Sequence, residues 1–211
     1  MRFLLGFFAL IAFPVWADGE RAGDFDYYVL ALSWSPNFCA QLLETDHPQC
    51  AAGKSFGFVL HGLWPQYEQG WPSNCKTSHG PPSRRDTASE AIIYGSSGSA
   101  WHQWRKHGTC SGLSASEYYQ AARDAFASIN RPAILREIDK AYRLPASVVE
   151  DAFLDANPNL GTNQVTITCK GQMIQEVRIC MTKGFEPRQC GSDVIHDCTL
   201  TDAVFLPIPS N

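Results

Sequence analysis

The chain has 211 residues, of which 45% are hydrophobic and 18% are charged. This composition excludes an extensively disordered protein, and the length suits a single domain. The net charge of −4 argues against a broad basic surface for non-specific binding of polyanions, but it leaves room for a local basic site that grips one phosphate.

The first residues have the pattern of a secretory signal. Arg2 supplies a positive start, residues 3–13 are apolar and uncharged, and Val15-Trp16-Ala17 offers a cleavage site. The apolar run is shorter than the ~20 residues that span a bilayer. We therefore expect a signal peptide at 1–17 and a domain at 18–211. That domain would lie in a periplasm or outside the cell, with no membrane attachment after the signal is removed.

Export explains the eight cysteines, which we interpret as a disulfide framework. None of them forms a CxxC pair, which weakens a structural zinc interpretation.

Two apolar segments near the start predict buried strands, at 27–34 and 57–64. Pro36 follows the first strand, and the segment 38–54 is expected to be a loop. Pro65 is expected to stop the second strand, because proline cannot donate to a β-ladder.

The middle of the chain predicts helices. Their expected ranges are 86–94, 100–107, 114–129, 132–141 and 147–156. Ser114 with Glu117 forms a capping box, and we expect Ser147 with Glu150 to cap the last helix in the same way. Pro132 suits the first turn of the fourth helix.

The last fifty residues predict strands again. Residues 164–169 and 173–181 alternate apolar and polar side chains around an expected hairpin turn at 170–172, and 203–208 reads as a closing strand. Strands, then helices, then strands indicate an α+β fold.

His61 lies near the end of the second predicted strand and is followed by Gly62, which leaves the backbone open beside the imidazole. For a lone histidine, a structural core position with one satisfied hydrogen bond is the more common alternative.

The helix at 100–107 carries four polar side chains on one face. At 100° per residue, His102, Gln103, Lys106 and His107 fit within one sector. Two imidazoles, an ammonium and an amide are costly to bury in a hydrophobic core, but they can bind a phosphate. The alternative is a solvated polar face.

These residue types match the chemistry of RNA cleavage. The 2′-hydroxyl must lose a proton and the departing 5′-oxygen must gain one, and histidine titrates in the range that serves both steps. A lysine ammonium stabilises the negative charge that develops on the phosphoryl oxygens. The nucleophile belongs to the substrate, so the scheme needs no metal or cofactor, and the 2′-hydroxyl excludes DNA.

The segments HGLWP at 61–65 and HxWxKHGTC at 102–110 together resemble the two catalytic segments of the T2 family of ribonucleases. Weaker similarity runs from about Asp26 to the last strand. The resemblance implies an α+β fold with a central antiparallel sheet flanked by several helices. It also implies endonucleolytic cleavage of single-stranded RNA through a 2′,3′-cyclic phosphate, and we expect a monomer.

The resemblance also implies roles for the site residues. His107 would be the general base on the 2′-hydroxyl, and His61 the general acid on the leaving oxygen. Lys106 would stabilise the phosphorane, and His102 would help to hold the phosphate.

Two positions depart from the family pattern. Gln103 stands where the family usually has a glutamate; it can form hydrogen bonds but cannot relay a proton or carry charge. We expect retained activity with an altered pH profile. Ser33 stands where a glutamine is frequent near a base site, which leaves the preference for the downstream base open.

RNA bases are commonly held on aromatic rings. Trp64 is the best candidate, with Gln66 and Tyr67 beside it and Trp71 as a weaker one. Core packing is the alternative for each of them.

The family pattern implies four disulfides: Cys39–Cys50, Cys75–Cys110, Cys169–Cys198 and Cys180–Cys190. The second would tie the loop after the His61 strand to the end of the helix that carries His107, and so fix their spacing.

Two other functions are weighed. One is a zinc hydrolase that uses His61, His102 and His107, although no supporting carboxylate is evident from the sequence and Lys106 is a poor neighbour for a cation. The other is a secreted RNA-binding or inhibitory protein whose catalysis is weakened by Gln103.

Overall fold

A computed structural model of the chain describes residues 20–43 and 46–209. The expected signal peptide lies outside these residues. Within the described part, no helix combines the length and the apolar character that a membrane crossing requires.

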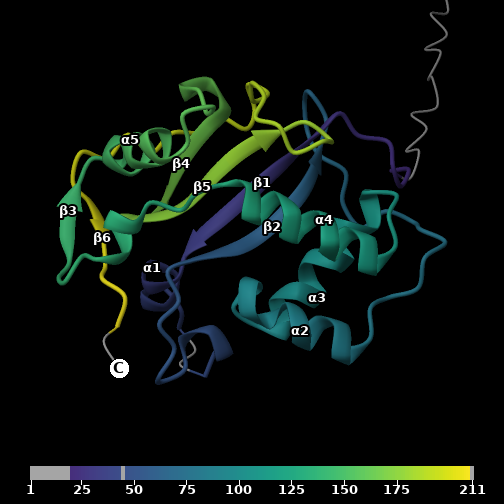
Figure 1. Cartoon of the computed structure of the whole chain (residues 1–211), viewed down its shortest axis with the longest axis horizontal. Coiled ribbons are helices and arrows are strands. Elements are labelled where there is room, and N and C mark those ends of the chain that lie inside the picture. Colours follow the sequence, from purple (N-terminus) through teal and green to yellow (C-terminus); the bar gives the residue numbers. More distant parts are fainter. Residues whose placement is uncertain (1–19, 44–45, 210–211) are drawn as a thin grey trace, which may run out of the picture.

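A six-stranded sheet forms the centre of the molecule (Figure 1). Its order is β2 (Phe58–Gln66), β1 (Tyr27–Trp34), β5 (Met173–Met181), β6 (Ala203–Phe205) and β3 (Tyr142–Leu144), and β4 (Val165–Lys170) also pairs with β5. The named pairings are antiparallel except that of β5 with β6. The predicted α+β fold with a central, mainly antiparallel sheet is confirmed.

Every residue of β1 is buried, because the strand lies between β2 and β5 and is covered on both faces. Tyr28, Leu30 and Leu32 face the main core, whereas Tyr27 and Val29 join a smaller cluster on the other side. Burial on both faces explains why this strand is a continuous apolar run.

Figure 1 shows α2 (Arg84–Tyr94), α3 (Ser97–Lys106) and α4 (Ala115–Ser128) grouped beside β2, while α5 (Ala146–Ala156) lies near β4. The capping box of Ser114 and Glu117 at the start of α4 is confirmed. Both α2 and α3 begin a few residues earlier than predicted, at the caps provided by Ser83 and Ser96.

Two predictions about the first half of the chain are wrong. Strand β2 does not stop at Pro65 but continues to Gln66; it is an edge strand of the described sheet, where proline is tolerated. The expected loop at 38–54 overlaps the end of a short helix, α1 (Ser35–Ala40), and includes a 3₁₀ turn at Pro48–Cys50.

The predicted helix at 132–141 is also wrong. Only a 3₁₀ turn forms there, at Ala133–Arg136, and the chain then enters strand β3. Pairing of β3 with β6 overrides the local helical pattern. Helix α5 is preceded by Pro145 as its N-cap, without a side-chain capping bond, so the expected cap at Ser147 does not form.

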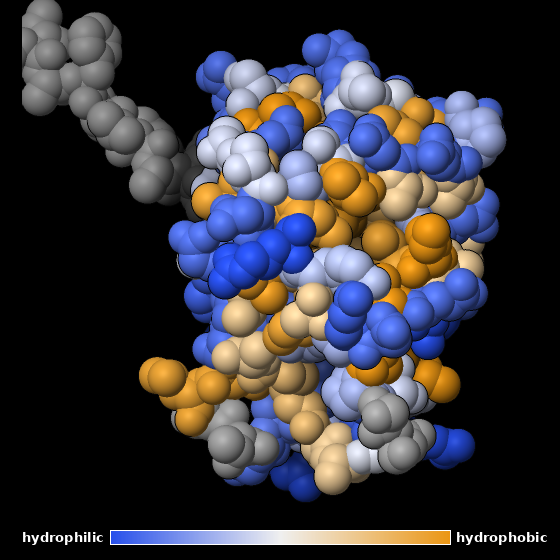
Figure 2. Space-filling model, turned by 90° about the vertical axis from the view of Figure 1, so that its left-hand side faces the viewer, coloured by the Kyte–Doolittle hydropathy of each residue, from blue (hydrophilic) through white to orange (hydrophobic). Residues whose placement is uncertain are grey.

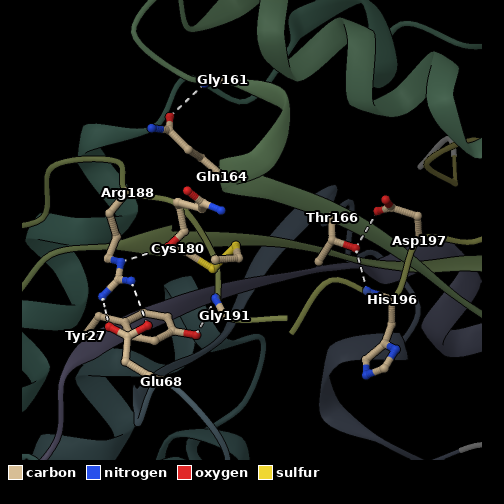
Figure 3. The surroundings of a disulfide bond; sticks show 12 residues. Tyr27, Glu68, Gly161, Gln164, Thr166, Cys180, Arg188, Gly191, His196 and Asp197 are labelled. Carbon is tan, nitrogen blue, oxygen red and sulfur yellow. Dashed lines mark hydrogen bonds and ion pairs between the residues drawn. A yellow bond between two sulfur atoms is a disulfide. The ribbon is translucent and has the colours of Figure 1, made fainter. Parts of the chain in front are cut away.

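The structure contains the four disulfides that the family resemblance implies: Cys39–Cys50, Cys75–Cys110, Cys169–Cys198 and Cys180–Cys190. Figure 3 shows the surroundings of Cys180. Next to it, the Tyr27 hydroxyl accepts a hydrogen bond from the Gly191 N–H at 3.1 Å. The Arg188 guanidinium lies 4.2 Å from the centre of the Tyr27 ring and forms an ion pair with Glu68 at 2.8 Å. These contacts anchor the segment that precedes Asp193.

Figure 2 looks onto the end of the molecule that carries β3 and α5, where hydrophobic residues lie in patches between hydrophilic ones. At this end an apolar groove of about 670 Å³ is bordered by the exposed side chains of Ile134, Tyr142 and Val148. The groove shares no lining residue with the cavities described next.

Candidate active site

Two adjoining cavities, of about 360 and 300 Å³, lie between the sheet and α3. They share the lining residues His61, His102, Gln103, Gln175 and Glu176. His107 and Lys106 line the larger cavity. The structure therefore gathers the five predicted catalytic side chains around one space, although they come from two segments that are about forty residues apart.

His61 occupies an irregular position in β2. Gly62 is paired with Ala31 and Leu60 with Leu32, so His61 has no partner residue on β1. Such a bulge re-aims the side chain of the extra residue and is frequent beside active sites. The His61 side chain is 41% exposed and lines both cavities.

Gly62 allows a bond between the two catalytic segments. The Trp64 indole N–H donates to Oε1 of Gln103 at 2.8 Å. A Cβ atom at position 62 would overlap both of these atoms. The glycine of the HGLWP segment is therefore required by the close approach of two side chains.

Helix α3 presents His102, Gln103 and Lys106 to the larger cavity, and His107 follows as its C-cap. The His107 backbone N–H still donates to the Gln103 carbonyl oxygen, at 2.9 Å, so its position is fixed by the last helical turn. The predicted polar face of this helix lines the cavity.

The His107 imidazole is buried, with 5% of the residue exposed, and the Trp64 ring stacks on it with centres 5.2 Å apart. Its Nδ1 atom has no hydrogen-bond partner among the described residues. Burial lowers the pKa of His107 to about 3, and the positive charges of Lys106, His61 and His102 act in the same direction. The ring is therefore neutral and can accept a proton.

His61 has the opposite surroundings. Its Nδ1 atom forms a short hydrogen bond with Oε1 of Glu176, a residue that is only 2% exposed. Arg178 donates to the other carboxylate oxygen from Nε at 2.9 Å, and its Nη2 atom lies 2.8 Å from the same oxygen as part of the ion pair. Burial alone would raise the pKa of Glu176, but the bond to His61 and the charges of His61 and Arg178 hold it at about 2.

Glu176 and Arg178 were not among the residues predicted from sequence, although β5 carries a signal for them. They lie two residues apart in an otherwise mainly apolar strand and so share one face of the sheet. Buried charged residues are rare unless they are paired.

Asp193 was also missed. One of its carboxylate oxygens accepts from the Gly70 N–H at 2.6 Å, and the other, Oδ1, is buried without a hydrogen-bond partner in the described part of the chain. The residue lines the larger cavity. No local pattern around position 193 marks it in the sequence.

The proposed base-binding residues are placed differently from one another. Trp64, Gln66 and Trp71 line the larger cavity, and Trp71 is 56% exposed. Tyr67 does not line it and instead packs, partly buried, against the main core. Ser33 lines the smaller cavity.

The Cys75–Cys110 disulfide joins the loop after β2 to the turn that follows α3. Beside it, the Asn74 N–H donates to the Lys106 carbonyl oxygen at 2.8 Å. The loop after β2 and the segment at 102–110 are thus connected by a disulfide and by a hydrogen bond.

One argument against a zinc site does not hold. No supporting carboxylate is evident from the sequence, yet Glu176 contacts His61 directly. In residues 20–43 and 46–209, no three His, Cys, Asp or Glu side chains converge as metal ligands.

The model of the ribonuclease T2 family matches residues 25–190. A ribonuclease of Aeromonas hydrophila is 49% identical over 110 residues, which are 52% of this chain and 48% of that protein. A probable ribonuclease of Haemophilus influenzae is 33% identical over 120 residues, which are 51% of this chain and 44% of its own length. The matched part of this chain thus spans about half the length of these relatives.

Solved structures show the same fold. RNase NT in complex with 5′-AMP has a TM-score of 0.64 and 24% identity, over 87% of this chain and 98% of that one. Trichomaglin, an S-like ribonuclease, has a TM-score of 0.66 and 22% identity, over 89% and 100% of the two chains. With the family model covering most of the chain, the chain belongs to the ribonuclease T2 family.

Proposed function

We propose that this chain is an endoribonuclease that cleaves single-stranded RNA by attack of the 2′-hydroxyl, with a 2′,3′-cyclic phosphate as intermediate. The observation that carries this proposal is the pair His61 and His107, which line one cavity in contrasting surroundings beside Lys106.

The surroundings of the two rings support their roles. His107 is buried with a depressed pKa, so it is neutral and suits a general base that takes the 2′-hydroxyl proton. His61 lies against the Glu176 carboxylate, which binds Nδ1 and leaves Nε2 to act as a general acid on the 5′-oxygen. The resemblance to the family implies the same assignment.

Lys106 and His102 come from one turn of α3 and line the larger cavity with the two histidines. The Lys106 ammonium would stabilise the extra negative charge of the phosphorane, since a fixed charge in a partly enclosed site acts strongly on the transition state. His102 would hold a phosphate oxygen. Gln103 supplies an amide in place of a carboxylate, so it positions Trp64 but relays no proton.

A base would bind against the aromatic part of the larger cavity. Trp71 is exposed enough to stack on a base, and Trp64 offers a second ring at the same site. Gln66 and the unpartnered Oδ1 of Asp193 would contact base edges. Tyr67 is not part of this proposed base site, because it packs against the core.

We further propose that residues 1–17 are removed during export and that the mature protein acts as a monomer in a periplasm or outside the cell. The support is the charge and hydropathy pattern of the N-terminus together with four disulfides, which persist in oxidising compartments.

Digestion of homopolymer RNAs in EDTA, with identification of the products, tests the proposal. We expect cleavage to continue in chelator and to yield 2′,3′-cyclic phosphates. His61→Phe and His107→Phe should each lower the rate by at least ~10²-fold. His79→Phe, at an exposed position that lines neither cavity, is the control.

Other outcomes identify the alternatives. Cleavage that stops in EDTA and returns with added zinc would indicate a metallohydrolase. RNA binding without any cyclic phosphate would indicate a binding or inhibitory protein.

A further inference from the structure

Glu176 is a buried carboxylate with both oxygens occupied. Oε1 contacts His61, and Oε2 accepts a hydrogen bond from Nε of Arg178 and forms an ion pair with its Nη2 atom. A buried carboxylate is costly unless it is paired and hydrogen-bonded. These partners meet that requirement and hold the carboxylate in one orientation.

The contact between His61 and Glu176 crosses a whole strand. They lie on β2 and β5, which flank β1, so their backbones are separated by two strand spacings of roughly 4.8 Å each. The β1 residues beneath the contact are Ala31 and Ser33, which share a face with the cavity-lining Val29. Because both are small, the imidazole and the carboxylate can meet above them.

The direction of this contact decides which nitrogen of His61 serves the substrate. Since the carboxylate occupies Nδ1, Nε2 is left for the cavity. The charged and titratable groups that face His61 from α3 are Lys106, His102 and His107, and the carboxylate offsets the positive charge of Lys106. Glu176 is the nearest negative charge to the ring, and Arg178 of the same strand faces the carboxylate rather than the imidazole.

Arg178 links this contact to the rest of the site. Besides binding Glu176, its guanidinium lies 5.4 Å from the centre of the Trp64 ring, which in turn stacks on His107. The arginine thus holds Glu176 from the side opposite to His61.

We propose that Glu176, held by Arg178, is a positioning residue that keeps His61 oriented for proton donation from Nε2 to the leaving oxygen. This inference rests on the proposed function. As the bond between phosphorus and the 5′-oxygen breaks, that oxygen takes the proton from Nε2 of His61. His61 becomes neutral and retains its Nδ1 proton, and Glu176 stays ionised throughout.

The test compares two substrates that differ in their need for an acid. One is a dinucleotide; the other is a ribonucleoside 3′-(p-nitrophenyl phosphate), whose nitrophenolate departs without protonation. We expect Glu176→Gln to lower kcat on the dinucleotide by about 10-fold or more, and on the nitrophenyl ester by less than about 3-fold.

Glu90→Gln is the matched control, because Glu90 is equally buried and ion-paired, with Arg123, but lines neither cavity. It should leave both rates unchanged. Should Glu176→Gln fail to fold, Arg178→Gln provides a second test, for which we expect the same substrate-dependent pattern with a smaller amplitude.

Equal losses on both substrates, or no loss on either, would overturn the role of Glu176. The proposed function fails on a different result: wild-type protein that releases no cyclic phosphate, or His61→Phe with the wild-type rate on RNA.

Discussion

The indole N–H of Trp64 donates a hydrogen bond to Oε1 of Gln103, directly above the backbone of Gly62. This bond connects the HGLWP segment to the segment at 102–110. It fixes the tryptophan that stacks on His107 and lies edge-on to His61. The relative placement of the His61 and His107 imidazoles therefore depends on Trp64, which belongs to the same HGLWP segment as His61.

Gly62→Ala should disturb this arrangement. The added Cβ overlaps Trp64 Nε1 and Gln103 Oε1, so one of the two side chains must move. We expect a loss of about 1–3 kcal/mol in the free energy of unfolding, the usual scale for overpacking, together with a lower kcat. Gly80→Ala is the control, because a Cβ there meets nothing within 4 Å. Wild-type stability and kcat in Gly62→Ala would show that the close approach is not required.

Gln103→Glu should change the pH dependence of cleavage. A glutamate can still accept the Trp64 hydrogen bond, but its negative charge would favour protonated His107 and raise its pKa from about 3. The acidic limb of the kcat/KM profile should then move to higher pH. Gln103→Met, which loses the bond without adding charge, should not move it upward. An unchanged rate and profile in Gln103→Glu would refute our interpretation of this position.

Much of the site could be predicted from local sequence. His61, His107 and the α3 residues lie in two compact segments, and helix periodicity already places His102 and Lys106 on one side. Glu176 could not be assigned in this way, because its contact with His61 depends on the order β2-β1-β5 and on the bulge at His61.

The errors in secondary structure have the same origin. The residues 132–141 have helical character, but Tyr142–Leu144 pairs with β6, and only the short turn at Ala133–Arg136 remains. Likewise, Pro65 is tolerated in β2 because that strand lies at a sheet edge. In both cases the secondary structure depends on pairing between strands that are distant in the sequence, and such pairing leaves no pattern in the local sequence.

Trp71→Ala should weaken substrate binding more than catalysis. The side chain is exposed at the larger cavity, and stacking of one base contributes about 1–3 kcal/mol. We expect KM for a dinucleotide to rise about 5-fold or more while kcat changes little. Trp101→Ala serves as the control, since Trp101 is also exposed but lines neither active-site cavity. Equal KM values for the two variants would show that Trp71 does not contribute to base binding.

Removal of the Cys75–Cys110 disulfide should reduce activity as well as stability. Its cysteines are 35 residues apart, which corresponds to about 4 kcal/mol in the chain-entropy model. The Cys169–Cys198 disulfide closes a similar span of 29 residues, and neither of its cysteines lines the cavities. Replacing either pair by alanine should cost similar stability, but only the first should lower kcat under conditions where both variants are folded. Equal kcat values would show that the first disulfide does not position the histidines.

Acid should destabilise the fold through His107. Burial, followed by the charges of Lys106, His61 and His102, lowers its pKa from 6.5 to about 3 in the folded chain. Between these values the unfolded state binds more protons than the folded state. The contribution of His107 to stability is therefore complete above about pH 6.5 and is lost as the pH falls toward 3.

Urea unfolding between pH 3.5 and 7 measures this contribution. The free energy of unfolding should fall with decreasing pH by up to about 1.4 kcal/mol per pH unit from this one group. His107→Gln should flatten the slope, whereas His79→Gln, at an exposed position, should retain it. Glu176, with a pKa held at about 2, loses its contribution only at lower pH, from about 4.5 downward, so its effect is separable. Between pH 5 and 6.5 Glu176 does not titrate, so the slope in this range tests His107 alone of the two. If His107→Gln keeps the wild-type slope there, the folded protein does not hold the neutral, buried imidazole that the proposed general base requires.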